Sequence, residues 1–143
     1  MRTFTKTGEQ MARDVAVSLA DDVRALEHLI SGLLGPEVGN DIAGRADQMV
    51  SDYSDGDDYD GRNTVDAYLA GVLDVEIDGR FTNGGWEVRK VGLLVGYGGP
   101  TSRMTTTGDG EVDIVVNWCG DTATVTVYAP NLADRIWELS DGI

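Results

Sequence analysis

The chain has 143 residues, 41% of them hydrophobic, which suffices for one domain with its own core. Its 25 acidic and 11 basic residues give a net charge of −14, so its surface repels nucleic acid and anionic membranes. One Cys excludes an internal disulfide, and one His leaves few zinc ligands. We therefore expect a cytoplasmic protein that uses no cofactor or metal and contacts neither nucleic acid nor membrane directly.

The first half of the sequence predicts helices. Thr7 and Gln10 form a capping-box pattern at the start of a long helix that ends before Gly35-Pro36. A second helix is expected after Asp41, and a third after a cap at Asn63 or Thr64. The first helix should bury an apolar stripe with steps of three and four residues, which comprises Met11, Val15, Leu19, Val23, Leu26, Ile30 and Leu33.

The second half changes to the two-residue period of strands. Leu73, Val75 and Ile77 alternate with acids, as in a half-buried strand. Asn83-Gly84 is a hairpin turn signal, and a bulge near Arg89-Lys90 would bring the following strand into phase. The later strands are expected at Trp86–Val95, Thr101–Thr107, Glu111–Trp118 and Thr122–Tyr128.

A last helix begins at Pro130-Asn131 and should turn Leu132, Ile136 and Leu139 toward the sheet. Helices followed by closely spaced strands predict an α+β fold, with N-terminal helices packed on a mostly antiparallel sheet of about five strands and a short C-terminal helix. We expect a single domain over residues 1–143, with a helical part at 1–72, a meander at 73–128 and the last helix at 129–143.

No residue pattern indicates catalysis, so we expect a protein that is not an enzyme. His28 lies off the apolar stripe and should be at the surface, while Cys119 follows a core strand and should be a buried or half-buried structural thiol. The acidic stretch 52–61 fails as a calcium loop, because Gly56 and Ala67 would occupy the first and last ligand positions. The glycines between Gly96 and Pro100 indicate a tight turn or bulge where two strands change direction.

The density of carboxylates is the feature that suggests a function. Six aspartates and no base lie between Arg45 and Arg62, and three more acids share one face of the first strand. Duplex DNA presents one charge per roughly 1.7 Å of axis, so such a surface can compete for a groove built of Lys and Arg. The expected partner-binding residues are Asp52, Tyr53, Asp55, Asp57, Asp58, Tyr59, Asp60, Asp74, Glu76 and Asp78, with the tyrosines as aromatic anchors.

Three segments carry a resemblance: Leu73–Ile77, Val91–Pro100 and Val116–Asp121. They resemble a pattern in small proteins of phages, plasmids and other mobile elements, in which a Leu-Asp-(Ile/Val)-Glu strand precedes Gly-Gly-Pro and Trp-Gly-(Gly/Ser)-Asp turns. Here Cys119 stands between Trp118 and Gly120. The resemblance covers roughly residues 66–128. Some small acidic proteins of this kind resemble anti-CRISPR or anti-restriction proteins, which bind a host defence complex without catalysis.

Two hypotheses follow. In the first, the chain is a non-enzymatic inhibitor from a mobile element, whose acidic, DNA-mimicking surface binds the basic surface of a protein or ribonucleoprotein defence complex, either CRISPR-Cas or restriction. In the second, it is a structural or accessory acidic domain of a halophilic or high-GC host and has no cationic partner. A third possibility, an enzyme with paired carboxylates, would need two acids in one pocket. The sequence leaves the oligomeric state open.

Overall fold

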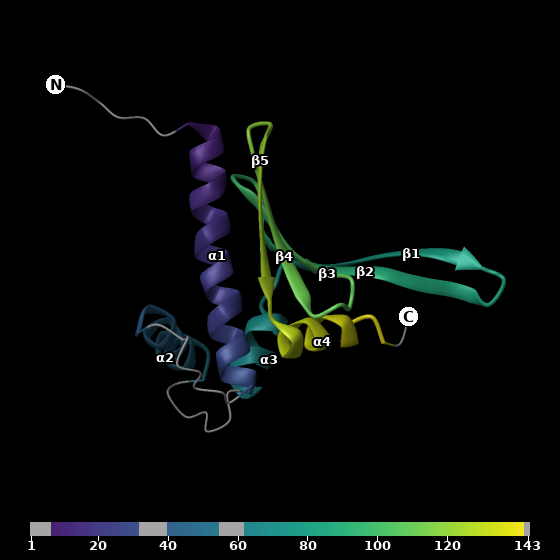
Figure 1. The fold of residues 1–143 in the computed structure, drawn as a ribbon, viewed down its shortest axis with the longest axis horizontal. Helices are drawn as coiled ribbons and strands as arrows, with labels where there is room; N and C mark the ends of the chain where they lie inside the picture. The colour runs from purple at the N-terminus through teal and green to yellow at the C-terminus, as the bar shows by residue number, and fades with distance from the viewer. Residues whose placement is uncertain (1–6, 32–39, 55–61, 142–143) are drawn as a thin grey trace.

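The computed structural model describes residues 7–31, 40–54 and 62–141 and confirms the α+β fold (Figure 1). The order along the chain is three helices, five strands and a short fourth helix. The helices and strands are α1 (Gly8–Ser31), α2 (Asn40–Ser54), α3 (Arg62–Ala70), β1 (Asp74–Thr82), β2 (Gly85–Gly96), β3 (Thr101–Thr106), β4 (Glu111–Trp118), β5 (Asp121–Tyr128) and α4 (Pro130–Glu138).

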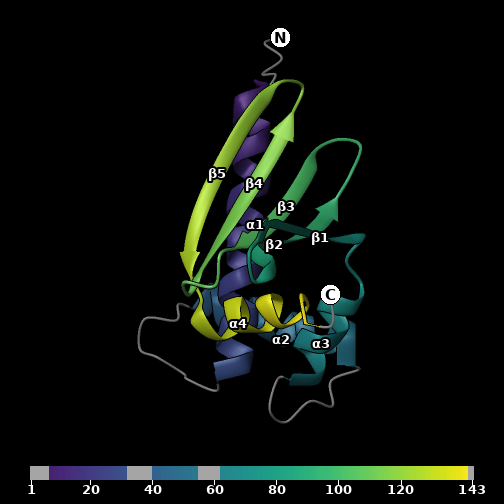
Figure 2. The same cartoon turned by 90° about the vertical axis from the view of Figure 1, so that its right-hand side faces the viewer.

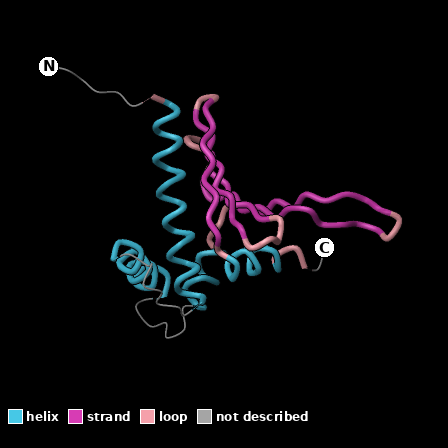
Figure 3. Tube along the Cα trace, viewed as in Figure 1, coloured by secondary structure: helices cyan, strands magenta, loops and turns pink. Residues whose placement is uncertain are grey.

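The five strands form one antiparallel meander in the order β1-β2-β3-β4-β5. α1 packs along β4 and β5, and α4 crosses the end of the sheet (Figures 1 and 2). α2 lies on the side of α1 that faces away from the strands (Figure 3). One face of the sheet is therefore covered by helices, while the other carries mostly polar side chains.

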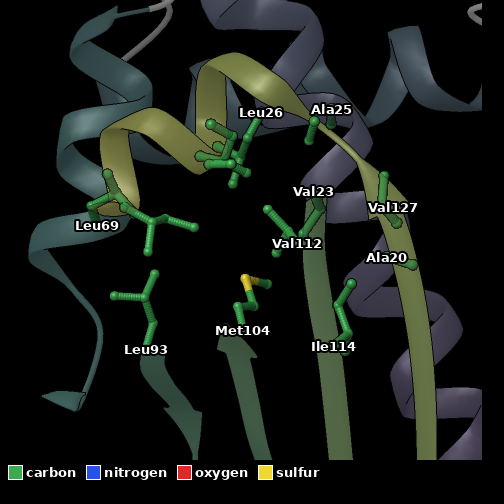
Figure 4. Close-up of a cluster of buried hydrophobic side chains, with 14 of the residues drawn as sticks. Ala20, Val23, Ala25, Leu26, Leu69, Leu93, Met104, Val112, Ile114 and Val127 are labelled. Atoms are coloured by element: carbon green, nitrogen blue, oxygen red, sulfur yellow. The ribbon is translucent and has the colours of Figure 1, made fainter. Parts of the chain in front are cut away.

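The core forms where α1 and α4 meet the covered face of the sheet (Figure 4). Side chains that point to the covered face from adjacent strands are fully buried, and Val23 and Leu26 of α1 close over them. α4 adds Leu132 and Ile136, but Leu139 lies beyond the end of the helix and is exposed, contrary to expectation. The strand residues concerned are Leu93, Met104, Val112 and Ile114.

The buried face of α1 differs from the expected stripe. Its N-terminal half buries Ala12, Ala16 and Ala20 completely, whereas Met11 is 37% exposed. Small side chains let a helix approach its neighbour closely, and here they let α1 lie against β4 and β5. Of the described members of the expected stripe, Val23 and Leu26 are fully buried, and Val15, Leu19 and Ile30 are half-buried beside them. Leu33 and the expected helix end before Gly35-Pro36 lie outside the described residues.

Side chains fix the starts of two helices. The capping box is confirmed, because the Thr7 N–H donates to Gln10 Oε1 and the Gln10 N–H donates to Thr7 Oγ1. At α4, a residue of α1 supplies the cap: Glu27 accepts hydrogen bonds from the Leu132 N–H at 2.8 Å and from Asn131 Nδ2 at 2.8 Å. A carboxylate at a helix N-terminus also complements the helix dipole, so Glu27 joins the two helices.

β1 and the first half of β2 form a two-stranded arm that extends beyond the helices (Figure 1). The expected hairpin at Asn83-Gly84 and the expected bulge are both present, since Lys90 pairs with Asp78 and Val88 pairs with Gly79, which leaves Arg89 as the extra residue. Because no helix covers the start of β1, Leu73 is 61% exposed and Val75 is exposed too, and only Ile77 is half-buried as expected.

Two aromatic rings lie at the tip of the arm. Phe81 and Trp86 are paired across the strands, and their ring centroids are 5.1 Å apart in an edge-on arrangement. The Trp86 ring lies over Gly79, where an added Cβ would be 2.6 Å from it. Phe81 is 82% exposed and Trp86 is 41% exposed. The tip therefore presents an apolar surface on a charged molecule.

Candidate functional site

The structure separates the two groups of expected partner-binding residues that it describes. Asp52 and Tyr53 lie at the end of α2, whereas Asp74, Glu76 and Asp78 lie on β1, on the opposite side of α1 (Figure 1). These two groups therefore belong to different surfaces. The other five expected residues lie outside the described residues: Asp55, Asp57, Asp58, Tyr59 and Asp60.

The outward face of α2 carries carboxylates whose charge is not balanced on that helix. Asp41, Asp47 and Asp52 are all exposed, and Asp52 accepts a hydrogen bond from the neutral Gln48 side chain at 2.9 Å. Arg45 instead reaches back to α1, where Nη1 lies 2.6 Å from Asp22 Oδ1 and 3.3 Å from the Ser18 carbonyl. We call Asp41, Asp47 and Asp52 the α2 acidic face.

Tyr53 adds an aromatic group beside this face. Its ring meets Tyr68 of α3 edge-on, with centroids 5.6 Å apart, and it is partly exposed. Burial raises the pKa of the Tyr68 hydroxyl, and the nearby Asp22 and Tyr53 raise it further, so Tyr68 stays neutral at physiological pH. The edge-on contact with Tyr68 holds the exposed Tyr53 ring in place, as an aromatic anchor at an interface requires.

The pairing of Asp22 with Arg45 gives a testable pH dependence. Burial raises the pKa of the Asp22 carboxyl above its ordinary 3.8, Arg45 lowers it through its hydrogen bond and charge, and Asp21 raises it; burial dominates. A raised folded pKa means that Asp22 contributes stability at acid pH, and that this contribution is lost as the pH rises through the folded value. We expect Asp22→Asn, which mimics the protonated form, to be at least as stable as wild type at pH 7.

Urea unfolding at pH 7 and at pH 3 would measure this effect. The advantage of Asp22→Asn should disappear at the lower pH, where the wild-type carboxyl is also protonated. Asp21→Asn provides a control, because Asp21 pairs with Arg24 within α1 at 2.9 Å and has no contact with α2 among the interactions described. A loss of stability at pH 7 that is confined to Asp22→Asn would contradict the expectation.

The acids of β1 are largely paired within the sheet. Glu76 accepts two hydrogen bonds from Arg103 of β3, from Nε at 2.7 Å and from Nη2 at 3.4 Å. Asp78 lies 3.7 Å from Lys90 of β2, and Asp74 accepts a hydrogen bond from the Val75 N–H. This strip therefore presents less uncompensated charge than the sequence suggested.

The Gly-Gly-Pro and Trp-Cys-Gly-Asp turns meet at one end of the sheet. They enclose a shallow hollow of about 260 Å³, lined by Tyr97, Gly98, Gly99, Thr101, Asn117, Trp118 and Cys119. The Trp118 ring packs on Gly99, where an added Cβ would be 2.9 Å away. Contrary to expectation, Cys119 is exposed, at a positive φ of 48° in the turn. The described lining holds no acid or base to activate its thiol.

A second hollow, of about 370 Å³, lies between α3 and α4, and the cation in its described lining is paired with carboxylates. Arg135 contacts Asp66 of α3 and lies 3.5 Å from Glu138.

His28, expected at the surface, is half-buried on α1. Within the described ranges, no group of three or more His, Cys, Asp or Glu side chains is arranged to hold a metal ion. No described helix is long and apolar enough to cross a membrane.

No protein-family model, curated protein or solved structure matches the chain. The functional proposal therefore rests on the surfaces of the molecule itself. Among them, the α2 acidic face is a surface where described carboxylates gather without a compensating cation, and its Asp52, with the neighbouring Tyr53, belongs to the set expected from sequence. Asp41 and Asp47 were not in that set, although Asp41 lies four residues before Arg45 and Asp47 lies five residues before Asp52, within the same expected helix.

Proposed function

We propose that the chain is a non-enzymatic inhibitor of the kind carried by mobile elements. Its α2 acidic face would bind the basic surface of a nucleic-acid-binding defence complex, either CRISPR-Cas or restriction, and so exclude DNA. In sequence, α2 is followed by four more aspartates, Asp55, Asp57, Asp58 and Asp60, which add to the negative charge of this part of the chain. Tyr53 would provide an aromatic contact beside it.

One observation carries this proposal: Arg45, the cation in the middle of α2, is directed inward. Its ion pair with Asp22 neutralises charge between the helices and leaves Asp41, Asp47 and Asp52 uncompensated outside. Placed on a rigid helix, these carboxylates need no ordering when a partner binds. Attraction between an acidic and a basic surface accelerates their association. This attraction weakens as salt is added, because ions screen exposed charges within about 10 Å at 0.1 M.

The paired acids of β1 take a smaller part in this function. A partner cation that approached Glu76 would have to compete with Arg103, which already contributes two hydrogen bonds. We therefore assign the primary contact to the α2 acidic face and treat the β1 strip as secondary.

The test is displacement of DNA from purified nucleic-acid-binding nucleases, with CRISPR effector complexes and restriction enzymes as the panel. We expect the wild-type chain to displace DNA from at least one member, with an inhibition constant that rises with salt. The triple variant Asp41→Asn, Asp47→Asn, Asp52→Asn should weaken this inhibition about tenfold or more, since each lost charge contact at an interface costs measurable free energy.

A matched variant separates a local effect from a general effect of charge. Glu111→Gln, Asp134→Asn, Asp141→Asn removes the same net charge from exposed positions on β4, on α4 and beyond α4. If both triple variants inhibit equally, the α2 acidic face is not the contact. If no panel member is inhibited, and both variants melt at higher temperature in low salt, the results favour the alternative of an acidic accessory domain without a cationic partner.

A further inference from the structure

The free edge of β1 is a second candidate interaction surface. β1 is the first strand of the sheet and pairs only with β2, and its outer half runs past the helices (Figures 1 and 3). An edge strand presents unpaired backbone N–H and C=O groups that can accept another strand. We propose that this edge pairs with β1 of a second copy of the chain, antiparallel and centred on Gly79, to form a two-fold symmetric dimer.

The sequence of the edge is self-complementary about Gly79. In an antiparallel pair with this centre, residue 78 lies opposite residue 80 of the other copy, and residue 77 lies opposite residue 81. Paired side chains share a face, so Asp78 meets Arg80 on one face and Ile77 meets Phe81 on the other. Each contact occurs twice because the interface is symmetric.

Existing ion pairs extend this match across the arms. Asp78 already lies 3.7 Å from Lys90, and Arg80 lies 3.7 Å from Glu87 on the same arm. Joined at Gly79, the two arms would form a row of alternating charge: Lys90 and Asp78 of one copy, then Arg80 and Glu87 of the other. Charges on edge strands often prevent pairing, but here Asp78 and Arg80 would each face an opposite charge, while Glu76 would face Thr82.

The apolar face of the arm fits the same partner. Phe81 is 82% exposed and lies against the partly exposed Trp86 ring, so the tip offers an apolar patch that a second copy can cover. In the dimer Phe81 would pack on Ile77 of the second copy, a residue that already borders the core. Gly79 adds no side chain of its own at the axis, and the Trp86 ring that lies over it would be beside its symmetry mate.

Charge favours a second copy over an unrelated partner at this site. Residues 74–96 carry four acids and three bases, a net −1 within a chain of −14. Two copies repel each other through the rest of the surface, and the arm is where they can approach with little repulsion. Salt screens this repulsion and also the Asp78–Arg80 pairs, so the dimer should depend on salt less than binding of a basic partner does. This inference does not rest on the proposed function, because the arm variants test the dimer and the variants of the α2 acidic face test binding of a basic partner.

Sedimentation velocity over a concentration series at moderate salt tests the dimer. The wild-type chain should show a reversible monomer–dimer equilibrium. Asp78→Arg and Arg80→Asp should each weaken it about tenfold or more, because each places two like-charge pairs in the interface. Glu111→Arg, a charge reversal on exposed β4, should leave the equilibrium unchanged.

Mixing the two arm variants separates a lost contact from a damaged arm. In the mixture, one chain carries arginine at both positions 78 and 80, and the other carries aspartate at both. Every facing pair then has opposite charges, so a heterodimer should form although neither variant dimerises alone. An arm that had merely unfolded could not be rescued in this way. A wild-type chain that stays monomeric at all concentrations and salts, a dimer that is insensitive to both reversals, or a mixture without rescue would each overturn the proposal.

Discussion

Ala16→Leu is expected to lower the free energy of unfolding by about 1–3 kcal/mol, the usual cost of forcing extra methylene groups into a filled core. Ala16 has no exposed surface and lies in the middle of the alanine row with which α1 contacts the sheet. A leucine there would push α1 away from β4 and β5 and loosen the contacts of Ala12 and Ala20 as well. Chemical denaturation monitored by circular dichroism would measure the loss.

Val17→Leu is the matched control, because Val17 is the next residue and lies 45% exposed on the outer side of α1. It should change stability by less than about 0.5 kcal/mol, as surface substitutions usually do. If instead Ala16→Leu were tolerated and changes at Met11 were costly, α1 would pack with the stripe expected from sequence and not with its alanine row.

Glu27→Ala is expected to cost about 2 kcal/mol, within the range for hydrogen bonds to a charged group. The substitution leaves the Leu132 N–H and the Asn131 amide without their acceptor and removes a negative charge from the start of α4. Because α4 covers the end of the core through Leu132 and Ile136, the loss should appear as reduced global stability. Thermal and urea unfolding would both report it.

Two further variants divide the contribution of Glu27. Glu27→Gln keeps the acceptor oxygen and loses the charge, so it should recover part of the stability. Asp47→Asn removes an exposed helical carboxylate that has no described partner and should be nearly neutral. Equal losses for Glu27→Ala and Asp47→Asn would show that net charge, and not the contact between α1 and α4, sets the effect.

The strands could be predicted well because their signals are local. Val112, Ile114 and Val116 recur at every second position of a strand, and all three are buried, as that period predicts. The bulge could also be predicted. Val88 and Val91 are three residues apart, so they can share a face of the sheet only if the strand contains one extra residue between them. The expected ends of β2, β3, β4 and β5 differ from the observed ones by at most one residue.

The buried face of α1 could not be read as easily. Hydrophobic periodicity favours large side chains such as Met11 and Leu19, whereas close packing on a sheet selects small ones such as Ala12 and Ala16. Both rows have the same period and lie next to each other on the helix. Only the position of β4 and β5 decides between them, and that is information about tertiary structure.

Sequence patterns could not predict contacts between residues that are far apart in the chain. Glu27 and Leu132, and likewise Asp22 and Arg45, meet only because the helices are folded together. The inward direction of Arg45, which defines the α2 acidic face, is a consequence of this kind. In contrast, the self-complementary run Ile77-Asp78-Gly79-Arg80-Phe81 was present in the sequence. It becomes meaningful only once β1 is known to be an edge strand.

Arg89, the extra residue of the bulge, sets the bend of the arm and could be removed without a change of register. The pairs on either side of it, Asp78 with Lys90 and Gly79 with Val88, keep their side chains on the same faces with or without the extra residue. Deleting Arg89 would therefore straighten the ribbon while preserving every cross-strand neighbour. A single codon sets the direction in which Phe81 and Trp86 point, so the reach of the arm can be adjusted by evolution, or by design, without any change to the core.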